Sequence, residues 1–120
     1  MYAGYGLLID SELTLPDLAR DAAPGAPPDV VVRLGPVAPP TADAVLLPLG
    51  LWVDGERIGI DVPGVARYSC SGGSLITVQP APGASDDALR LFLLGSALGC
   101  LLTQRGLLVL HGNAFVVDGG

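Results

Sequence analysis

The sequence contains no lysine, and its six arginines face twelve aspartates and glutamates, which gives a net charge of −6. Proteins that bind nucleic acids need lysine and arginine to neutralise phosphates. An anionic membrane surface attracts the same basic clusters, and none occurs here. We therefore expect no nucleic-acid partner and no membrane partner, and we interpret the acidity as a contribution to solubility.

Cysteine and histidine are also scarce. The two cysteines, Cys70 and Cys100, lie far apart with no CxxC pair, and the single histidine is His111. No zinc site can be assembled from this spacing. The first residues, MYAGYGLLID, lack the basic region and the long apolar core of a signal peptide. We expect a cytoplasmic protein with reduced thiols.

Aromatic residues make up only 5% of the chain, and no apolar run approaches the ~20 residues of a membrane span. The longest run, from Leu91 to Leu102, contains Gly95, Ser96 and Gly99. We expect it to form a buried helix. Gly95 and Gly99 have the GxxxG spacing, which predicts that another element packs tightly against this face. Gly95→Leu would then destabilise the fold by about 1–3 kcal/mol through overpacking.

The chain of 120 residues is long enough for one domain or part of one. Residues 5–10 predict a first strand, and the β-branched run at 30–35 predicts another. Two proline-rich segments, 21–29 and 36–43, are expected to be loops.

The middle of the chain predicts an antiparallel β-meander. Residues 49–61, LGLWVDGERIGID, place Asp54-Gly55 between two alternating runs, which is typical of a hairpin with a type I′ turn. Residues 66–79 repeat the pattern, with Ser71-Gly72-Gly73 at the turn.

One long helix is expected at about 86–104. Ser85 is a good N-cap, and Asp86 and Asp87 suit the positive end of the helix dipole. Gly106 provides the C-terminal stop. Together with the meander, this helix predicts an α+β fold.

The last residues, LLVLHGNAFVVDGG, contain two apolar strand-like runs that can form one continuous strand. Asp118-Gly119 then repeats the turn signal of Asp54-Gly55, but no partner strand follows it. This pattern predicts that the chain is the leading part of a longer protein.

The residues offer no complete catalytic constellation. No serine lies in a GxSxG elbow, and SCSGG at 69–73 lacks the lysine and the helix start of a phosphate loop, so we expect a plain turn. Asp86 and Asp87 are interpreted as dipole partners rather than metal ligands. His111 has two interpretations: a structural histidine at a strand end, or an acid, base or phosphate-site residue.

Two stretches nevertheless form a known arrangement: YGLLIDSELTLPDL, and the region from SGGSLITVQPAPGAS through LFLLGSALGCLLTQRGLLVLHGNAFVVDGG. They resemble the N-terminal region of HPr serine kinase-like proteins, a branch of the P-loop phosphotransferases. The most specific part is Leu89–Gly120, where a leucine-rich helix precedes an Arg-Gly pair, a strand and a histidine. Residues 21–67 match only in strand pattern.

The resemblance implies that residues 1–106 are an N-terminal β-rich leader domain. Residues 107–120 would be the first strand or strands of a P-loop kinase-like domain, truncated before its GxxxxGK[ST] loop. The full-length protein would transfer phosphate from ATP, with Mg²⁺, to a hydroxyl of a protein or peptide substrate. This chain would hold no cofactor and would be inactive alone. Among its residues only His111 matches a family site position, near the phosphate loop.

The alternative is a stand-alone peptide-binding or oligomerisation module. An unpaired edge of the sheet would accept a peptide by strand addition, or would pair with a second copy to give a homo-oligomer. The residues beyond Gly120 and the oligomeric state of the chain distinguish these two hypotheses.

Overall fold

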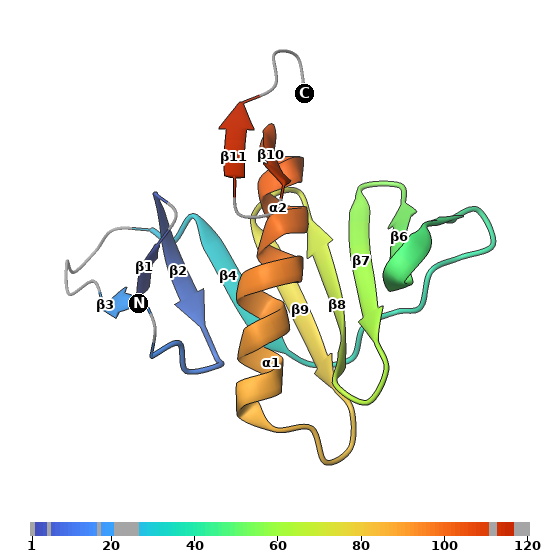
Figure 1. Ribbon diagram of the computed structural model, residues 1–120, viewed down its shortest axis with the longest axis horizontal. Helices are drawn as coiled ribbons and strands as arrows, with labels where there is room; N and C mark the ends of the chain where they lie inside the picture. The colour runs from blue at the N-terminus through green and yellow to red at the C-terminus, as the bar shows by residue number, and fades with distance from the viewer. Residues whose placement is uncertain (1, 5, 17, 21–26, 111–112, 117–120) are drawn as a thin grey trace.

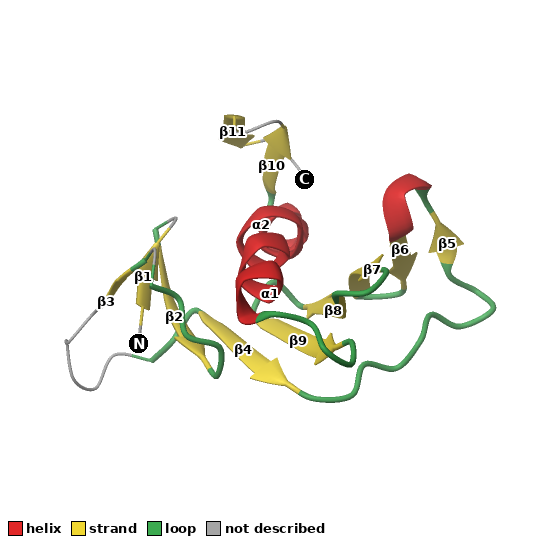
Figure 2. Ribbon diagram, turned by 60° about the horizontal axis from the view of Figure 1, so that its bottom comes forward, coloured by secondary structure: helices red, strands yellow, loops and turns green. Residues whose placement is uncertain are grey.

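The computed structural model describes residues 2–4, 6–16, 18–20, 27–110 and 113–116, and the fold is α+β. It has two layers, because a single long helical segment lies across one face of a wide mixed β-sheet (Figure 1). Figure 2 shows the helix above the middle strands, with strands extending beyond it on both sides.

Among the described residues the sheet contains nine strands, in the order β3-β1-β2-β4-β9-β8-β7-β6-β5. The strands are β1 (Tyr2–Gly4), β2 (Leu7–Ser11), β3 (Ala19–Arg20), β4 (Val30–Leu34), β5 (Val45–Leu46), β6 (Leu51–Asp54), β7 (Arg57–Val62), β8 (Ala66–Ser71) and β9 (Leu75–Pro80). A short 3-10 turn, η1 (Pro48–Gly50), joins β5 to β6.

The predicted antiparallel meander is confirmed, since β5, β6, β7, β8 and β9 each pair antiparallel with the next. The predicted turn type at the first hairpin is wrong. Asp54 pairs with Arg57, so the two turn residues are Gly55 and Glu56. Only Gly55 has a positive φ, at 60°, which is the pattern of a type II′ turn rather than type I′. The second turn is confirmed, with positive φ at Gly72 and Gly73.

Two parallel pairings were not anticipated. Strand β4 pairs parallel with β2 on one side and with β9 on the other, which makes the sheet mixed. The proline-rich segment after β4 crosses the face of the sheet opposite the helix and reaches β5 at the far edge (Figure 2). The predicted first strand at 5–10 corresponds to β2. The short strand β1, which was not predicted, precedes it, and Gly6, with φ of 75°, lies between the two.

The helical segment covers the predicted range. It consists of α1 (Asp86–Phe92), a π-helical stretch η2 (Leu93–Ala97) and α2 (Leu98–Gln104). The Ser85 Oγ accepts a hydrogen bond from the Ala88 amide at 3.1 Å, as expected of the N-cap. Gly106, with φ of 84°, follows its end. The π-helical turn was not predicted. In a regular α-helix, with 3.6 residues per turn, residues spaced four apart move gradually around the helix. The wider π-helical turn offsets this rotation and keeps such apolar residues on one face.

The helix is buried on one face only. The side chains that it packs against the sheet are Leu89, Leu93, Ala97, Leu98, Leu101 and Leu102. On the opposite face Leu91 is 68% exposed. A side-chain carbon added at Gly95 or Gly99 would meet no atom within 4 Å. The expected close packing of the GxxxG face is therefore wrong among the described residues, and the overpacking predicted for Gly95→Leu finds no other element close to the added Cβ.

After the helix, β10 (Leu107–Leu110) and β11 (Asn113–Val116) form a separate two-stranded antiparallel sheet. The alternative of one continuous strand is therefore wrong. The turn predicted at Asp118-Gly119 lies outside the described residues. None of the helices in the described part of the chain has the length and apolar character that a membrane crossing requires.

Two polar atoms tie the helix to the sheet inside the core. The Tyr68 hydroxyl donates a hydrogen bond to the Leu89 carbonyl at 2.8 Å, and the Cys70 thiol donates to the Ala97 carbonyl at 3.2 Å. Burial raises the pKa of the Tyr68 hydroxyl to about 12 and raises the pKa of the Cys70 thiol. Both groups are therefore neutral in the folded protein at physiological pH.

These shifts predict alkaline destabilisation. Tyr68 ionises near its usual pKa of ~10 in the unfolded chain but only near 12 when folded. Its contribution to stability is thus complete below pH 10 and is lost as the pH rises towards 12. Urea midpoints measured between pH 8 and about 11.5 should fall through this window. In a Cys70→Ala, Cys100→Ala background, Tyr68→Phe should make the urea midpoint less dependent on pH in this range. An unchanged pH dependence of the midpoint would contradict this explanation.

Candidate functional site

The one site residue predicted from the sequence, His111, lies outside the described residues. The flanking described residues Leu110 and Asn113 pair with each other across β10 and β11.

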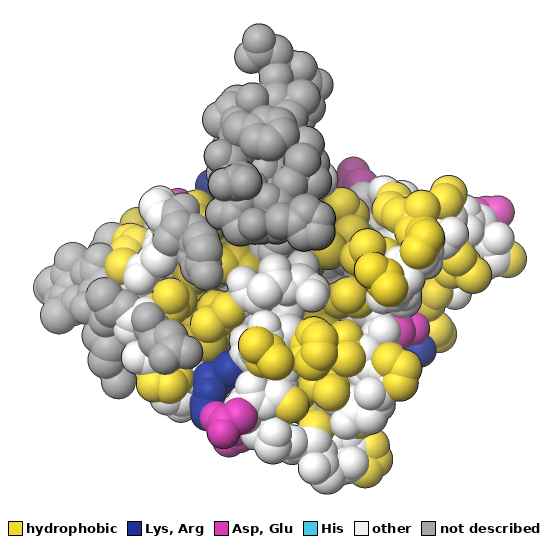
Figure 3. Space-filling view, in the orientation of Figure 1, with side chains coloured by type: hydrophobic (Ala, Val, Ile, Leu, Met, Phe, Trp, Pro, Cys, Tyr) yellow, Lys and Arg dark blue, Asp and Glu magenta, His cyan; other side chains and the backbone are white. Residues whose placement is uncertain are grey.

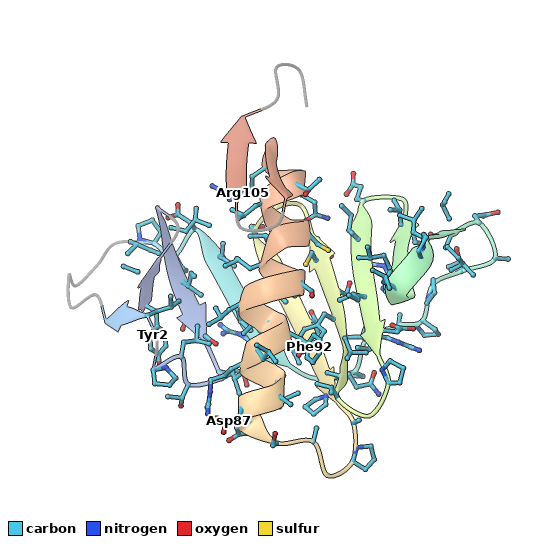
Figure 4. The ribbon with its side chains drawn as sticks, viewed as in Figure 1. Tyr2, Asp87, Phe92 and Arg105 are labelled. Atoms are coloured by element: carbon cyan, nitrogen blue, oxygen red, sulfur yellow. The ribbon has the colours of Figure 1, made fainter. Side chains whose placement is uncertain are left out.

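The glycine-rich turn at 69–73 is fastened by the end of the helix. The Gly73 amide donates to the Gln104 Oε1 at 3.0 Å, and the Gly73 carbonyl accepts from the Arg105 Nη1 at 2.7 Å. The Gln104 Nε2 also donates to the Cys70 carbonyl at 2.8 Å. Figure 4 labels Arg105 at this end of the helix. Because the Gly73 amide is already bound, the stretch is a structural turn, as predicted, and does not form a cradle of free amides for phosphate.

Asp86 and Asp87 lie at the beginning of α1, where Asp87 forms an ion pair with Arg90 (Figure 4). Within the described ranges, no group of three or more histidine, cysteine or acidic side chains is arranged to hold a metal ion. Both cysteines are free, and burial raises the pKa of each thiol, which weakens them as nucleophiles.

The arginines whose side chains the structure describes are engaged within the protein. Arg105 binds the Gly73 carbonyl, and the others form ion pairs: Arg33 with Asp10 and Glu12, Arg57 with Asp54, Arg67 with Asp61, and Arg90 with Asp87. None of these five is an unpartnered cation that could hold a phosphate group.

A polar cluster on the sheet face opposite the helix centres on Trp52. The indole lies over Gly59 and donates from Nε1 to the Asp61 Oδ1 at 3.1 Å, and Arg67 donates to the same oxygen at 2.9 Å. Arg57 stacks on the ring, with its Cζ 4.8 Å from the centroid. Since the charges of Asp61 and Arg67 neutralise each other, the cluster stabilises the sheet and offers little attraction to a charged ligand.

The same face holds down the segment that crosses it. Arg57 donates to the Ala38 carbonyl at 2.9 Å, and the Thr41 amide donates to the Asp54 carboxylate at 2.9 Å. The hydrogen bond from the Thr41 amide, together with those from the Thr41 hydroxyl and Arg57, lowers the pKa of Asp54. Asp54 therefore stays ionised at physiological pH, and its hydrogen bonds with Thr41 hold the 36–43 segment against the sheet.

The most unusual surface lies at the β5 end of the sheet. Four of the seven exposed large hydrophobic side chains in the described residues fall between 45 and 49: Val45, Leu46, Leu47 and Leu49. Figure 3 shows hydrophobic side chains gathered over this edge, at the upper right of the helix-bearing face. Of these four, Leu46 pairs with Trp52 and therefore lies on the opposite face of the sheet from Val45. Isolated exposed leucines are ordinary, but a contiguous apolar patch is typical of an interaction surface.

Leu49 is the most exposed member of this patch, at 89%. Its backbone has φ of 64° and ψ of 26°, and it is the only non-glycine residue with positive φ in the described part of the chain. A left-handed leucine costs about 1–2 kcal/mol, which asparagine or glycine would largely avoid. The described part of the fold gains no buried contact from this side chain in return.

The sequence analysis did not find this patch. Its signal is the run from Ala44 to Val53, AVLLPLGLWV, which contains no charged residue. Comparison of the chain with protein families, with curated proteins and with solved structures found no match.

Proposed function

We propose that this chain is the N-terminal, binding region of an ATP-dependent serine kinase-like phosphotransferase that acts on a protein or peptide hydroxyl. The region binds and positions; the phosphate loop, and with it ATP and Mg²⁺, belongs to a kinase core beyond residue 120. The location expected for such a protein is the cytoplasm.

The observation that supports the proposal most directly is the order of elements in the region of closest resemblance. A leucine-rich helix at 86–104 ends before Gly106 and leads into β10, with the Arg-Gly pair between them. This is the order by which the resembling proteins approach their phosphate loop.

The test is ATP binding measured by calorimetry on two proteins. The 120-residue chain should show no saturable binding in the micromolar range, because it lacks a phosphate loop. The product of the complete reading frame should bind ATP and phosphorylate a serine-containing acceptor. Saturable micromolar binding by the 120-residue chain would sink the proposal, as would a stop codon directly after residue 120.

A stand-alone binding or oligomerisation module remains the second candidate, and the exposed patch at 45–49 favours it. Strand addition at β5 is a poor mechanism for such a module. The strand has two residues, and Pro48, which has no N–H, follows closely. Short edges and prolines are the devices by which proteins block edge pairing. Contact through side chains fits this surface better than hydrogen bonding along its edge.

A further inference from the structure

We infer that the exposed β5–β7 part of the helix-bearing face is a docking site for an amphipathic helix with lysine or arginine beside its apolar stripe. We call this surface the apolar wing; its residues are Val45, Leu47, Leu49, Leu51, Val53 and Ile58. The inference deepens the proposed binding role of this region and rests on that part of the proposal only.

The apolar wing is the outer half of a hydrophobic sheet face. One row of side chains across the strands is Cys70, Ile58, Val53 and Val45, in successive register. Cys70 lies beneath the helix and is 1% exposed, Ile58 and Val53 are half-buried, and Val45 is 59% exposed. Exposure is therefore lowest beneath the helix, intermediate at Ile58 and Val53, and highest at the outermost strand.

A neighbouring row repeats the gradient. Tyr68 is buried under the helix, Ile60 beside it is nearly buried, and Leu51, the next partner, is half-buried. The Leu47 amide donates to the Leu51 carbonyl, and Leu47 is 45% exposed. Both rows show that the sheet continues its apolar face past the single helix that covers it. An apolar sheet face is normally buried by a second layer.

The size of the uncovered strip fits one helix. Strands lie about 4.8 Å apart, so the distance from β7 to β5 is about 10 Å. A helix with its side chains is about 10–12 Å wide, and neighbouring helices pack about 8–10 Å apart. A helix placed beside α1–α2 would thus lie over β6. Leu49, projecting from η1 at the outer border, would contact its far side.

The charges at one end of the apolar wing indicate the polar character of the partner. Asp43, two residues before β5, and Glu56, in the β6–β7 turn, are exposed, and neither forms an ion pair among the described residues. The Glu56 carbonyl accepts from the Gln104 side chain at 3.0 Å, which places this turn beside the end of α2. Two unpaired carboxylates next to an uncharged apolar surface favour a basic partner over a second copy of this acidic chain.

The experiment uses a fluorescein-labelled leucine/lysine peptide of about 18 residues with leucines at helical spacing, and a matched leucine/glutamate peptide. By fluorescence anisotropy, the leucine/lysine peptide should bind saturably and gain helicity, and the glutamate peptide should bind at least tenfold more weakly. Leu47→Asn and Leu49→Asn should each weaken binding by about threefold to tenfold. The matched control is Leu91→Asn, which removes a leucine of intermediate exposure, 68% against 45% for Leu47 and 89% for Leu49, outside the apolar wing and should leave binding unchanged.

Leu49→Asn separates binding from folding, because asparagine tolerates the left-handed conformation. Leu49→Asn should slightly raise the urea midpoint of unfolding while weakening the binding of the leucine/lysine peptide. Equal binding by all variants, equal binding of the glutamate peptide, or binding without a gain of helicity would overturn the inference. So would sedimentation showing a dimer that Leu47→Asn dissociates, since a second copy would then cover the apolar wing. If the peptide does not bind but the product of the complete reading frame binds ATP, only the docking inference is lost. If the peptide binds but that product does not bind ATP, only the phosphotransferase proposal is lost.

Discussion

Gly59→Ala should lower the free energy of unfolding by about 3 kcal/mol, at the upper end of the range for overpacking. A Cβ at this position would overlap the Trp52 indole, which pairs with Gly59 across β6 and β7 and is 1% exposed. The ring would have to leave its place against the sheet. The Trp52–Asp61 hydrogen bond and the Arg57 stacking would be lost with it.

Trp52 is the only tryptophan, so its fluorescence reports the change directly. Urea titration should show a lower midpoint, and the native emission should shift to the red as the indole becomes solvated. The matched control is Gly95→Ala, which meets no atom within 4 Å and should be neutral or stabilising by up to ~1 kcal/mol through helix propensity. In a Trp52→Ala background Gly59→Ala should cost little. A normal midpoint and emission for Gly59→Ala alone would refute the indole–glycine contact.

Leu101→Ala should lower the free energy of unfolding by about 2–5 kcal/mol. Leu101 lies in α2 on the face that packs against the sheet, and it is fully buried. Removing its side chain leaves a cavity that the rigid sheet beneath cannot fill by relaxation. The helix would keep its backbone but lose a central contact with the strands it covers.

Leu91→Ala is the matched substitution on the opposite face of the same helix. Leu91 is 68% exposed, so this change should stay within about 0.5 kcal/mol of the parent. Urea midpoints of the two variants, measured side by side, check the assignment of the buried face. Equal losses at both positions would mean that the helix is covered on both sides, contrary to the observed packing.

The ends of the helix and the turns of the meander were predictable because their signals are local. Ser85 binds the amide three residues on, and Gly106 needs only its own backbone freedom. The type of the first hairpin turn was predicted wrongly because Asp54 is needed elsewhere. Its carboxylate binds Thr41 and Arg57, and it stays within the strand opposite Arg57. The competing contact comes from a loop that the local pattern does not include.

The packing of the GxxxG face and the exposure of the apolar wing could not be predicted from local sequence signals. Gly95 and Gly99 have the spacing of a packed face, but the sheet takes the leucine face of the helix instead. A leucine face buries more apolar area than a glycine face, and the hydrophobic effect scales with that area. The uncharged run at 44–53 does not by itself show which of its side chains are covered in the folded protein. Their exposure follows from the position of the helix several strands away.

The sequence by itself determined two elements: the antiparallel meander, and the helix at 86–104 with its cap and stop. These depend on hydrophobic period, turn chemistry and capping, which act within a few residues. Only the tertiary structure decided the parallel pairings of β4, the contact of Trp52 with Gly59, and which apolar side chains remain uncovered. These depend on contacts between residues distant in the chain, because a side chain is buried only when another element occupies the space above it.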